Sequence, residues 1–563
     1  MNVNSETHFS QVPDTIVGHS VFDRPFDWAG TCNAGVLNAF YLDESIPGDI
    51  YQITPSQLTR MTTPIFPVMG TIAFDMFYFF VPWRLVWTHT KNFFGENTST
   101  YWTPTTVYTM PYISTMNLGT RAPGDLAHQL GIPLNPGTHN ISSLPFRSVR
   151  LIWNEFFRAT QVEPPYLLNT GDGPDTDSTL NSLYPVSRIH DWAGSVLPSP
   201  QYSFGADVDS NGTVKIGLEG QMPVVTLATV WTSANLNANP LKFATTSSAG
   251  ATAAAAGNLG IGASGNAVDT TGTNTNTNAV LPSNLAASAD KAAASLGIDV
   301  NTLRMSVQMQ KTFEAMSRFG SRYVEVLRGI FGIVSDDARL QRPELIGAER
   351  WYLNMSDNYQ TSASSSTGTP LSTVSGISKT SGIGGKIRYS VREHGYVIGL
   401  FCLRIATRYY TQGIEPLWFR SGLFSVYNPK LAHIGEQPVY TRSIYAYGNT
   451  IQPGGTGNIF GYQEAWWEYR MSKNRLSGLL DPGSDLSSDT PPSPQGLGAY
   501  WTYGDWYNAS PTLSPSWLHE GSENVERTLA VTNEDQFIVN IHVDNKHVRP
   551  MPVYSVPGFV DHF

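Results

Sequence analysis

One stretch of the sequence, DVDSNGTVKIGLE at 207–219, spaces its oxygen-bearing side chains as a calcium-binding loop does. Two aspartates and an asparagine stand at alternate positions, and a glycine follows where such a loop turns. Calcium needs at least about six oxygen ligands, yet Leu218 replaces the closing acid and Glu219 comes one residue late. The residues TVKIGL alternate as a strand does. We therefore predict a hairpin turn here and no metal site.

A second motif, GIGASG at 260–265, has the G-x-G-x-x-G spacing of a dinucleotide-binding turn. That turn requires a strand before it and a helix after it, whereas alanines precede this one and a Thr/Asn-rich segment follows. The histidines, as in HVDNKH at 542–547, lack the compact spacing of zinc ligands. We find no nucleophile elbow and no P-loop lysine. The sequence thus predicts no catalytic residue, no cofactor and no metal.

Basic side chains gather in one short stretch, where Lys386, Arg388 and Arg392 fall on the same face of a predicted strand. Arg404 and Arg408 follow in the second strand of the same predicted pair. The first three residues could contact the phosphates of nucleic acid, and they are our candidate for a DNA-facing surface. A solvated face or an ion-paired interface would show the same pattern, so these interpretations stay open.

The composition favours β structure with extensive contacts. Charged residues make up 14% of the 563 residues, well below the roughly 25% of ordinary soluble domains. Aromatic residues and the turn formers glycine and proline are abundant, which indicates strands, long loops and much surface that never meets bulk water. The net charge of −10 argues against a basic-tail binder of nucleic acid. Cys32 and Cys402 fit two ordinary buried thiols in a protein assembled in a reducing cytoplasm.

The most apolar segment is FDMFYFFVPWRLVW at 74–87. A membrane-spanning helix needs about 20 apolar residues, and this run is shorter and contains an aspartate, a proline and an arginine. Aromatic and β-branched residues fit a pleated sheet, whereas proline cannot donate to its hydrogen-bond ladder. The pattern therefore predicts a strand, FDMFYFFV, that is buried in protein and stopped by Pro82.

Three further segments have clear periodicity. Residues 146–161 carry apolar side chains at helical spacing and precede two prolines, which predicts one amphipathic helix. Helical spacing returns over 301–332, where Gly320 is expected to divide it into two pieces. Residues 387–410 alternate like a pair of strands that meet near Glu393–Gly395.

The segment 203–300 differs in kind from the rest of the chain. Between Phe243 and Ala289 it has a single charge, Asp269, among alanine, glycine, threonine, serine and asparagine. Such a composition cannot bury much apolar surface. We predict an insertion that protrudes from the body and is ordered only through contact with other copies. The candidate residues at its tip are Gly260, Asn266, Thr271, Asn274 and Asn276.

Several stretches, taken together and in order, match one known family. They are FDRPF (22–26), YLDESIPGDIY (41–51), TPIFPVMGTIAFDMFYFFVPWRLVW (63–87), WNEFFR (153–158), HDWAGSVLPSPQ (190–201), RYVEVLRGIFGIVSDDARLQRPELIG (322–347), EHGYVIGL (393–400), GEQPVY (435–440), FGYQEAWWEYR (460–470) and RPMPVYSVPGFVDHF (549–563). The chain resembles the major capsid proteins of the microviruses, in particular the gokushovirus branch of small single-stranded DNA phages.

This resemblance implies a mainly β fold, namely a single eight-stranded antiparallel jelly roll with long loop insertions and a few helices. Residues 1–202 and 301–563 would form the jelly-roll body, and 203–300 would form a variable surface protrusion. Copies would assemble into a small T=1 icosahedral shell that encloses circular single-stranded DNA. The resemblance thus implies a structural protein that is not an enzyme, with the protrusion used in host attachment.

The resemblance also implies the partners. These are further copies of the chain, the encapsidated single-stranded DNA, other virion proteins such as a DNA pilot protein or a small basic protein, and a host cell-surface receptor, without membrane insertion. The protein would reside in the virion after assembly in the cytoplasm of a bacterial host. One departure stands out, because the family usually has a basic residue after HDWAGSVLPSPQ, where this chain has Tyr202.

Large aromatic residues are the expected anchors of the core or of interfaces between copies, because tryptophan and tyrosine are enriched where interfaces are strongest. The candidates are Trp83, Trp87, Trp153, Phe156, Trp466 and Trp467. The resemblance places Trp83–Trp87 where the chain leaves the buried strand toward neighbouring subunits. We therefore expect alanine at position 83 or 87 to abolish particles.

Two other classes stay open: a secreted β-rich carbohydrate-binding or glycoside-hydrolysing protein, and a lectin-like binding module. A secreted glycoside hydrolase would require a signal peptide and two carboxylates in one cleft. The start MNVNSETHFSQVPDT lacks the basic and apolar parts of a secretion signal. Adjacent acids such as Asp336 and Asp337 point apart in a strand. Sedimentation would separate a shell from a monomeric binding module.

Overall fold

The structure, a computed structural model, consists of two compact units: Met1–Tyr202 with Phe313–Phe563, and Ser203–Thr312. The described residues are 18–96, 106–119, 121–201, 300–319, 322–362, 371–406, 408–446, 458–481, 501–505, 510–519, 523–531 and 534–554, with short strands between 224 and 287. The first unit contains two large antiparallel sheets, and these determine where the other elements lie.

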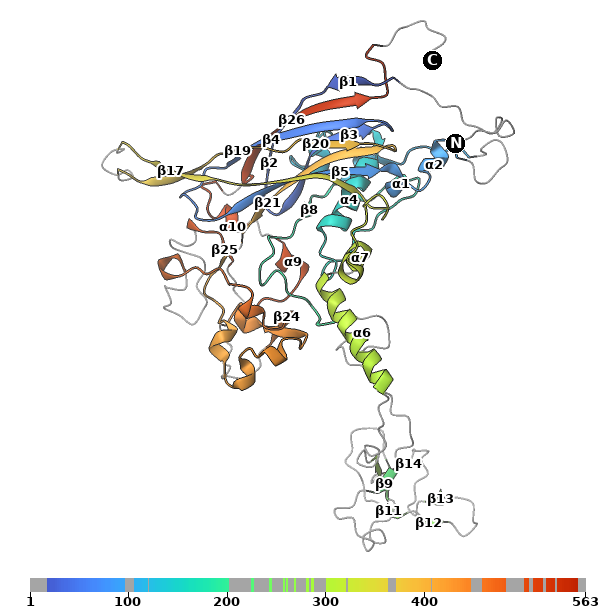
Figure 1. The fold of residues 1–563 in the computed structure, drawn as a ribbon, viewed down its shortest axis with the longest axis vertical. Coiled ribbons are helices and arrows are strands. Elements are labelled where there is room, and N and C mark those ends of the chain that lie inside the picture. The colour runs from blue at the N-terminus through green and yellow to red at the C-terminus, as the bar shows by residue number, and fades with distance from the viewer. Residues whose placement is uncertain are drawn as a thin grey trace. The chain divides into compact units, whose positions relative to one another are not determined.

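The first sheet is built around the last strand of the chain. Its strands are β1 (Ser20–Asp23), β2 (Phe26–Cys32), β26 (Phe537–Arg549), β4 (Ile50–Met61), β19 (Thr380–Ile383) and β20 (Ile387–Ser390). Strand β26 pairs with β1 and β2 on one side and with β4 on the other. Figure 1 shows β26 between β1 and β4. Buried and exposed residues alternate along β26 from Phe537 to His547. One face of this sheet therefore meets the core and the other meets solvent.

The second sheet contains the segment that the sequence singled out as most apolar. Its order is β16 (Glu344–Tyr352), β5 (Ile72–Pro82), β21 (Gly395–Ile405), β3 (Val36–Ser45) and β8 (Tyr184–Pro185). The predicted strand is confirmed as β5, which ends at Pro82. Almost every residue of β5 and β21 is buried, so this sheet is covered on both faces.

The two sheets pack face to face over a shared hydrophobic core. Val539 and Ile541 of β26 meet Phe74 of β5 and Phe401 of β21 in one cluster. The rings of Phe74 and Phe401 stack with their centroids 5.3 Å apart. The side chains that alternate inward on each strand thus form the centre of a β sandwich.

A helix covers the outer face of the second sheet. Helix α4 (Leu144–Ile152) continues as a π-helical turn, Trp153–Phe157, and confirms the predicted amphipathic helix. Its last turn places Phe156 4.8 Å from Phe79 and Phe157 5.3 Å from Phe77, measured between ring centroids. Short helices α1 (Trp83–Val86), α2 (Thr90–Phe93) and α3 (Leu126–Gln129) lie nearby in the sequence.

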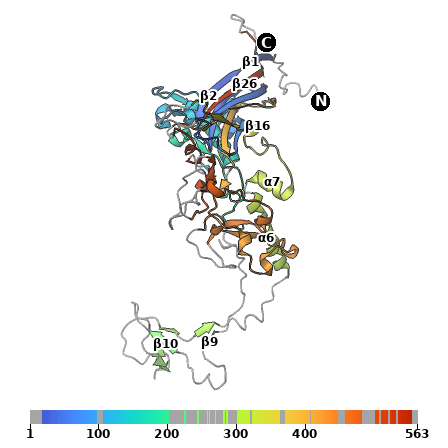
Figure 2. The same ribbon diagram turned by 90° about the vertical axis from the view of Figure 1, so that its left-hand side faces the viewer.

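The predicted division of the second helical segment is also confirmed. Helix α6 (Val300–Phe319) ends before Gly320, and α7 (Tyr323–Phe331) follows as a separate helix (Figure 2). The backbone N–H of Arg322 donates to the side chain of Glu325 at 2.9 Å, which caps the start of α7. Gly332 ends α7 with φ of 67°, a left-handed conformation that glycine adopts without strain.

The predicted strand pair at 387–410 needs a correction. Two strands are present, but β20 pairs with β4 in the first sheet and β21 pairs with β3 and β5 in the second. They do not pair with each other, because residues 391–394 carry the chain from one sheet to the other. Local alternation identifies a strand but not the sheet that it joins.

Smaller elements complete the description. In the first unit they are β6 (Tyr112–Ser114), β7 (Asn140–Ser142), β17 (Met355–Tyr359), β18 (Val374–Ser378), β22 (Arg408–Tyr409), β23 (Glu436–Tyr440), β24 (Ile459–Glu464), β25 (Gly504–Asp505), α9 (Pro515–Leu518) and α10 (Glu523–Glu526). In the second unit β9 (Val224–Thr226) pairs with β15 (Leu285–Ala287), β10 (Lys242–Thr245) with β11 (Gly257–Asn258) and β14 (Val280–Pro282), and β12 (Gly260–Ile261) with β13 (Val268–Asp269).

Candidate functional site

The two tryptophans that follow β5 are buried inside their own subunit. Trp83 is 2% exposed and Trp87 is not exposed at all. The indole N–H of Trp87 donates to Asp172 Oδ1 at 2.7 Å. Both rings belong to the hydrophobic cluster between the second sheet and α4. The expectation that they reach toward neighbouring subunits is therefore corrected: the chain turns into helix α1 and folds these side chains back into the core.

Trp153 and Phe156 lie in the same cluster, on the π-helical turn. The indole N–H of Trp153 donates to the carbonyl oxygen of Pro185 at 2.7 Å. The ring of Phe156 is half-buried, and the guanidinium carbon of Arg342 lies 4.0 Å from its centroid. These two candidates therefore stabilise the packing of α4 against the sheet.

Trp467 belongs to a third hydrophobic cluster, apart from the two sheets. Trp466, the residue before it, is also buried. Trp467 stacks on Trp192 with 5.1 Å between centroids and 6° between planes. Trp466 has φ of 66°, a conformation that costs a non-glycine residue about 1 kcal/mol. Its indole N–H donates to the carbonyl oxygen of Leu431 at 3.0 Å, which joins Trp466 to the segment after β22.

The three basic candidates do share one exposed face. Lys386, Arg388 and Arg392 are exposed, while Ile387 and Val391 between them are buried. The alternation along β20 and the turn after it produces this face. Arg404, which the sequence placed in the same strand pair, lies instead in the second sheet and binds Asp75.

The candidate tip residues Asn266, Thr271, Asn274 and Asn276 lie outside the described residues, and Gly260 is the first residue of strand β12.

A buried carboxylate explains the single acid in the apolar strand β5. Asp75 is 1% exposed, yet two arginines from the neighbouring strands reach it. Arg350 of β16 donates from Nη2 to Oδ2 at 2.9 Å, and Arg404 of β21 donates from Nε to Oδ2 at 2.7 Å. Because a buried charge is tolerated only when it is paired, these three side chains form one unit. No local sequence pattern predicts this unit, because 275 and 329 residues separate the partners.

A second network joins the two ends of the chain. Asp43 of β3 accepts hydrogen bonds from Arg24 Nη1 at 2.9 Å, from the Tyr51 hydroxyl at 3.1 Å and from Arg549 Nη2 at 3.3 Å. His547 of β26 is fully buried, with Nε2 3.5 Å from Asp43 Oδ2. Arg24 Nη1 lies 3.1 Å from its Nδ1 and must be the donor there, so the neutral ring carries its hydrogen on Nε2.

We expect this network to make the stability of the subunit sensitive to acid. Burial is the main reason that the pKa of His547 falls from its ordinary 6.5 to about 4; Asp43 opposes this shift, whereas Arg549 and Arg24 contribute to it. Between these values the unfolded chain binds the proton and the folded chain does not, so stability decreases as the pH falls from about 6.5 toward 4. The shift corresponds to at most about 3 kcal/mol. Denaturant unfolding of the subunit at pH 7 and pH 4.5 measures the difference.

Two variants isolate the contribution of His547. His547→Asn should reduce the loss of stability between the two pH values, because the titrating group is gone. His542→Asn, at an exposed position of the same strand, should leave the loss as it is in the wild type. An unchanged pH dependence in His547→Asn would show that other groups cause it.

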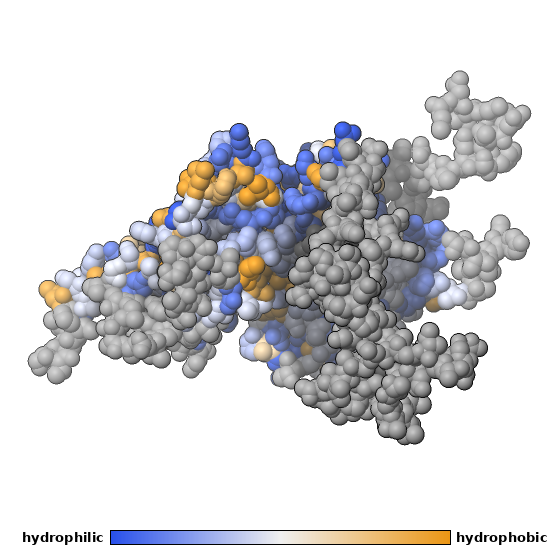
Figure 3. All heavy atoms as spheres, turned by 90° about the horizontal axis from the view of Figure 1, so that it is seen from below, coloured by the Kyte–Doolittle hydropathy of each residue, from blue (hydrophilic) through white to orange (hydrophobic). Residues whose placement is uncertain are grey.

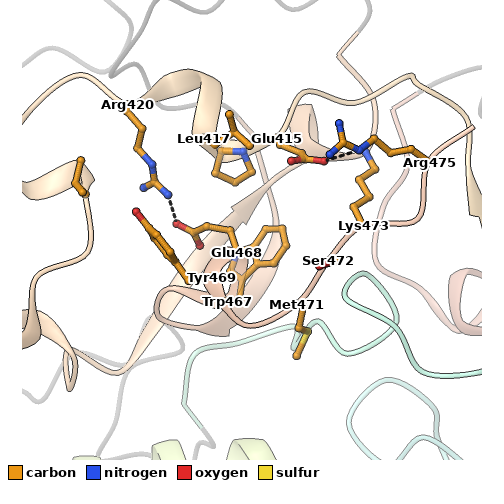
Figure 4. Close-up of a pocket in the computed structure, with 12 residues that line it drawn as sticks. Glu415, Leu417, Arg420, Trp467, Glu468, Tyr469, Met471, Ser472, Lys473 and Arg475 are labelled. Carbon is orange, nitrogen blue, oxygen red and sulfur yellow. Dashed lines mark hydrogen bonds and ion pairs between the residues drawn. The ribbon is translucent and has the colours of Figure 1, made fainter. Parts of the chain in front are cut away.

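A pocket of about 440 Å³ opens beside the third cluster. Figure 4 shows Arg420 and Glu468 facing each other at one side of it, with Glu415, Lys473 and Arg475 at the other. Arg420 Nη2 donates to Glu468 Oε1 at 2.8 Å, and Arg475 Nε lies 3.4 Å from Glu415 Oε1. Four of the five charged side chains that line the pocket are thus paired with one another, Arg420 with Glu468 and Arg475 with Glu415.

Lys473 forms part of the inner wall of this pocket. Its ammonium donates to the carbonyl oxygen of Ser443 at 3.0 Å and lies 5.3 Å from the ring centroid of Trp192. Burial lowers its pKa to about 8. The aromatic ring and the carbonyl both favour the charged form, so the side chain links Ser443 to Trp192.

No helix among the described residues is both long and apolar enough to cross a membrane. Within the same ranges, no three His, Cys, Asp or Glu side chains are grouped as metal ligands would be.

Two packed antiparallel sheets, a covering helix and a separate aromatic cluster define a structural β-sandwich protein. The chain belongs to the family described as Capsid protein (F protein), whose model matches residues 10–559. It is a structural major capsid protein and not an enzyme, and the family forms its shells from many copies of one chain. This assignment decides against the alternative of a carbohydrate-active protein.

The relatives carry the same description. The chain is 33% identical to Capsid protein VP1 of Spiroplasma virus 4 over 573 residues, which cover 99% of this chain and 98% of the relative. It is 30% identical to Capsid protein VP1 of Bdellovibrio phage phiMH2K, over 100% and 99% of the two chains. For Capsid protein VP1 of Chlamydia phage 1 the identity is 29%, over 98% of both. The resemblance to microvirus capsid proteins is thereby confirmed.

Proposed function

We propose that the sandwich is an eight-stranded jelly roll and that its copies form a T=1 icosahedral shell. The strand order carries this proposal. Numbered along the chain, β2, β3, β4, β5, β16, β20, β21 and β26 give the orders 1-8-3-6 in the first sheet and 2-7-4-5 in the second. Successive Greek-key connections produce this interleaving of two sheets. A shell subunit needs such a rigid body with long connections free to contact neighbours.

The shell would enclose circular single-stranded DNA, and the exposed face of Lys386, Arg388 and Arg392 would contact it. Three cations on one face can neutralise phosphates although the whole chain has a net charge of −10. Other virion proteins, such as a DNA pilot protein or a small basic protein, would complete the particle. Assembly would take place in the cytoplasm of the bacterial host.

The segment 203–300 would be the host-facing insertion. Two observations support this part of the proposal: Ser203–Thr312 forms a compact unit of its own, and its sequence has few charges and many Asn and Thr side chains. Those amide and hydroxyl groups can hydrogen-bond to a polar receptor. Residues 1–202 and 301–563 would then form the body of the subunit.

Replacing 243–289 with a short Gly/Ser linker tests this division of roles. We expect the variant to form particles in negative-stain micrographs, as the wild-type chain should, but to lose adsorption to host cells by at least tenfold. Shortening an insertion changes the loop-closure entropy by only about 0.6 kcal/mol per halving of its length, so the body should still fold. An unfolded variant would assign the segment to the core. Normal adsorption of the linker variant would show that residues 243–289 do not bind the receptor. If the wild-type chain forms no particles, the proposed shell is refuted.

A further inference from the structure

The segment that follows β22 presents large apolar side chains to solvent. These form the apolar patch, Leu417, Trp418, Leu423, Phe424, Val426 and Tyr427, whose members are 44% to 78% exposed. They lie on two 3-10 turns, Pro416–Phe419 and Leu423–Ser425, and the residues just after them. Leu417 and Val426 both line the pocket of about 440 Å³, so the patch and the pocket are continuous. Figure 3 shows hydrophobic residues gathered in groups on the described surface.

The patch is held in place from beneath. Arg420 donates to the carbonyl oxygen of Ser425 and, at 2.8 Å, to Glu468, which closes the loop between the two turns. The ring of Tyr427 lies 5.7 Å from that of Trp466 and 5.9 Å from that of Tyr469. These contacts fix the backbone while the apolar side chains point outward. A partner would therefore not bear the entropy of ordering the loop.

The patch is comparable in area to the largest apolar patch of a typical monomeric protein. Aromatic side chains bury roughly 150–250 Å² each when they are covered, so Trp418 and Phe424 alone expose roughly 200–350 Å². The largest apolar patch of a typical monomer is about 300–600 Å². With four further apolar members, the patch lies in the upper part of that range. Apolar patches of this size are often functional.

We propose that the apolar patch is a contact between copies of this chain in the assembled shell. The inference rests on the proposed shell, in which every subunit meets identical neighbours. The chemistry favours a second copy over DNA, because Arg420, the cation within the patch, is already paired with Glu468 and phosphates require free cations. It also favours a copy over a polar receptor, since the patch offers few donors. The adjoining pocket can receive a side chain of the neighbour.

Labelling a new cysteine tests the contact directly. In Leu423→Cys, a maleimide should react at least ten times faster with dissociated subunits than with intact particles. The background is low, because Cys32 and Cys402 are buried and burial raises the pKa of both thiols. Unfolded Leu423→Cys gives the rate of the fully accessible thiol.

Each of the other results would contradict the inference and would show what, if anything, covers the patch instead. Fast labelling in both states would mean that nothing covers the patch. Slow labelling in both would mean that another segment of the same chain covers it. Slow labelling in DNA-filled particles and fast labelling in empty ones would assign the patch to the genome.

A pair of substitutions gives a second, independent measurement. Trp418→Ala/Phe424→Ala should lower the particle yield at least tenfold and leave the melting temperature of the subunit within about 2 °C. The control Met116→Ala/Leu167→Ala removes exposed apolar side chains elsewhere and should assemble normally. Normal yield of the first variant would refute the inference. If the wild type forms no particles, the proposed shell is refuted. The contact would still be supported if wild-type subunits self-associate and subunits of Trp418→Ala/Phe424→Ala do not.

Discussion

Asp75→Ala should unfold the subunit or leave it only marginally stable. The substitution would leave Arg350 and Arg404 without the carboxylate that both now bind, and Arg404 is mostly buried. Removing one partner of a buried ion pair costs about 3–5 kcal/mol. A domain is stable by about 5–15 kcal/mol in total, so this loss takes a large share of it. Denaturant unfolding of the purified subunit measures the change in free energy.

A paired substitution shows whether the unpaired charge is the cause. Asp75→Leu/Arg404→Met removes both buried charges and fills the space with apolar atoms, so it should recover most of the stability. Arg350 is partly exposed and can turn to water. If the single and the double variant lose the same free energy of unfolding, the packing of these side chains, and not the unpaired charge, causes the loss.

Trp87→Ala should destabilise the subunit by about 3–5 kcal/mol, because it opens a large cavity in a fully buried site. The variant also loses the hydrogen bond from the indole N–H to Asp172. We expect few particles from it, but the cause should be unfolding of each subunit and not a lost contact between copies. The melting temperature of isolated subunits distinguishes these causes, since a lost contact would leave it unchanged.

Trp87→Phe is the matched control for the cavity. It keeps an aromatic ring in the site and gives up only the hydrogen bond and part of the volume. We expect a loss of about 1–2 kcal/mol, because Asp172 is partly exposed and water can replace the indole N–H. If the phenylalanine variant is as unstable as the alanine variant, the bond to Asp172 matters more than the packing.

The strands and helices with strong periodicity could be predicted because local sequence determines them. The run FDMFYFFV is buried on both faces and reads as a strand by composition alone, and Pro82 sets its end. The position of β20 and β21 in opposite sheets could not be predicted. Each of them pairs with strands that come hundreds of residues earlier, and alternation contains no information about the partner.

The candidate site was predicted by residue type and only in part by location. Large aromatic residues were expected to be anchors, and all six candidates are buried or half-buried. Which of them face the core depends on the turns that follow, as at Trp83 and Trp87. The apolar patch does have a sequence signal, since seven of the eleven residues in LWFRSGLFSVY (417–427) are apolar without helical or strand periodicity.

The central place of β26 in its sheet has a consequence for biosynthesis. Val543 pairs with Phe26 on one side and with Pro55 on the other. Strands β2 and β4, which are synthesised early, can therefore be joined in the sheet only after β26 has been synthesised. At roughly 5–20 residues per second, translation of the 563 residues takes about half a minute to two minutes. A chain released before residue 537 would lack the strand that joins β2 to β4 and would keep open edges for chaperones to bind. We therefore expect that only chains that contain β26 reach the folded state and enter a particle.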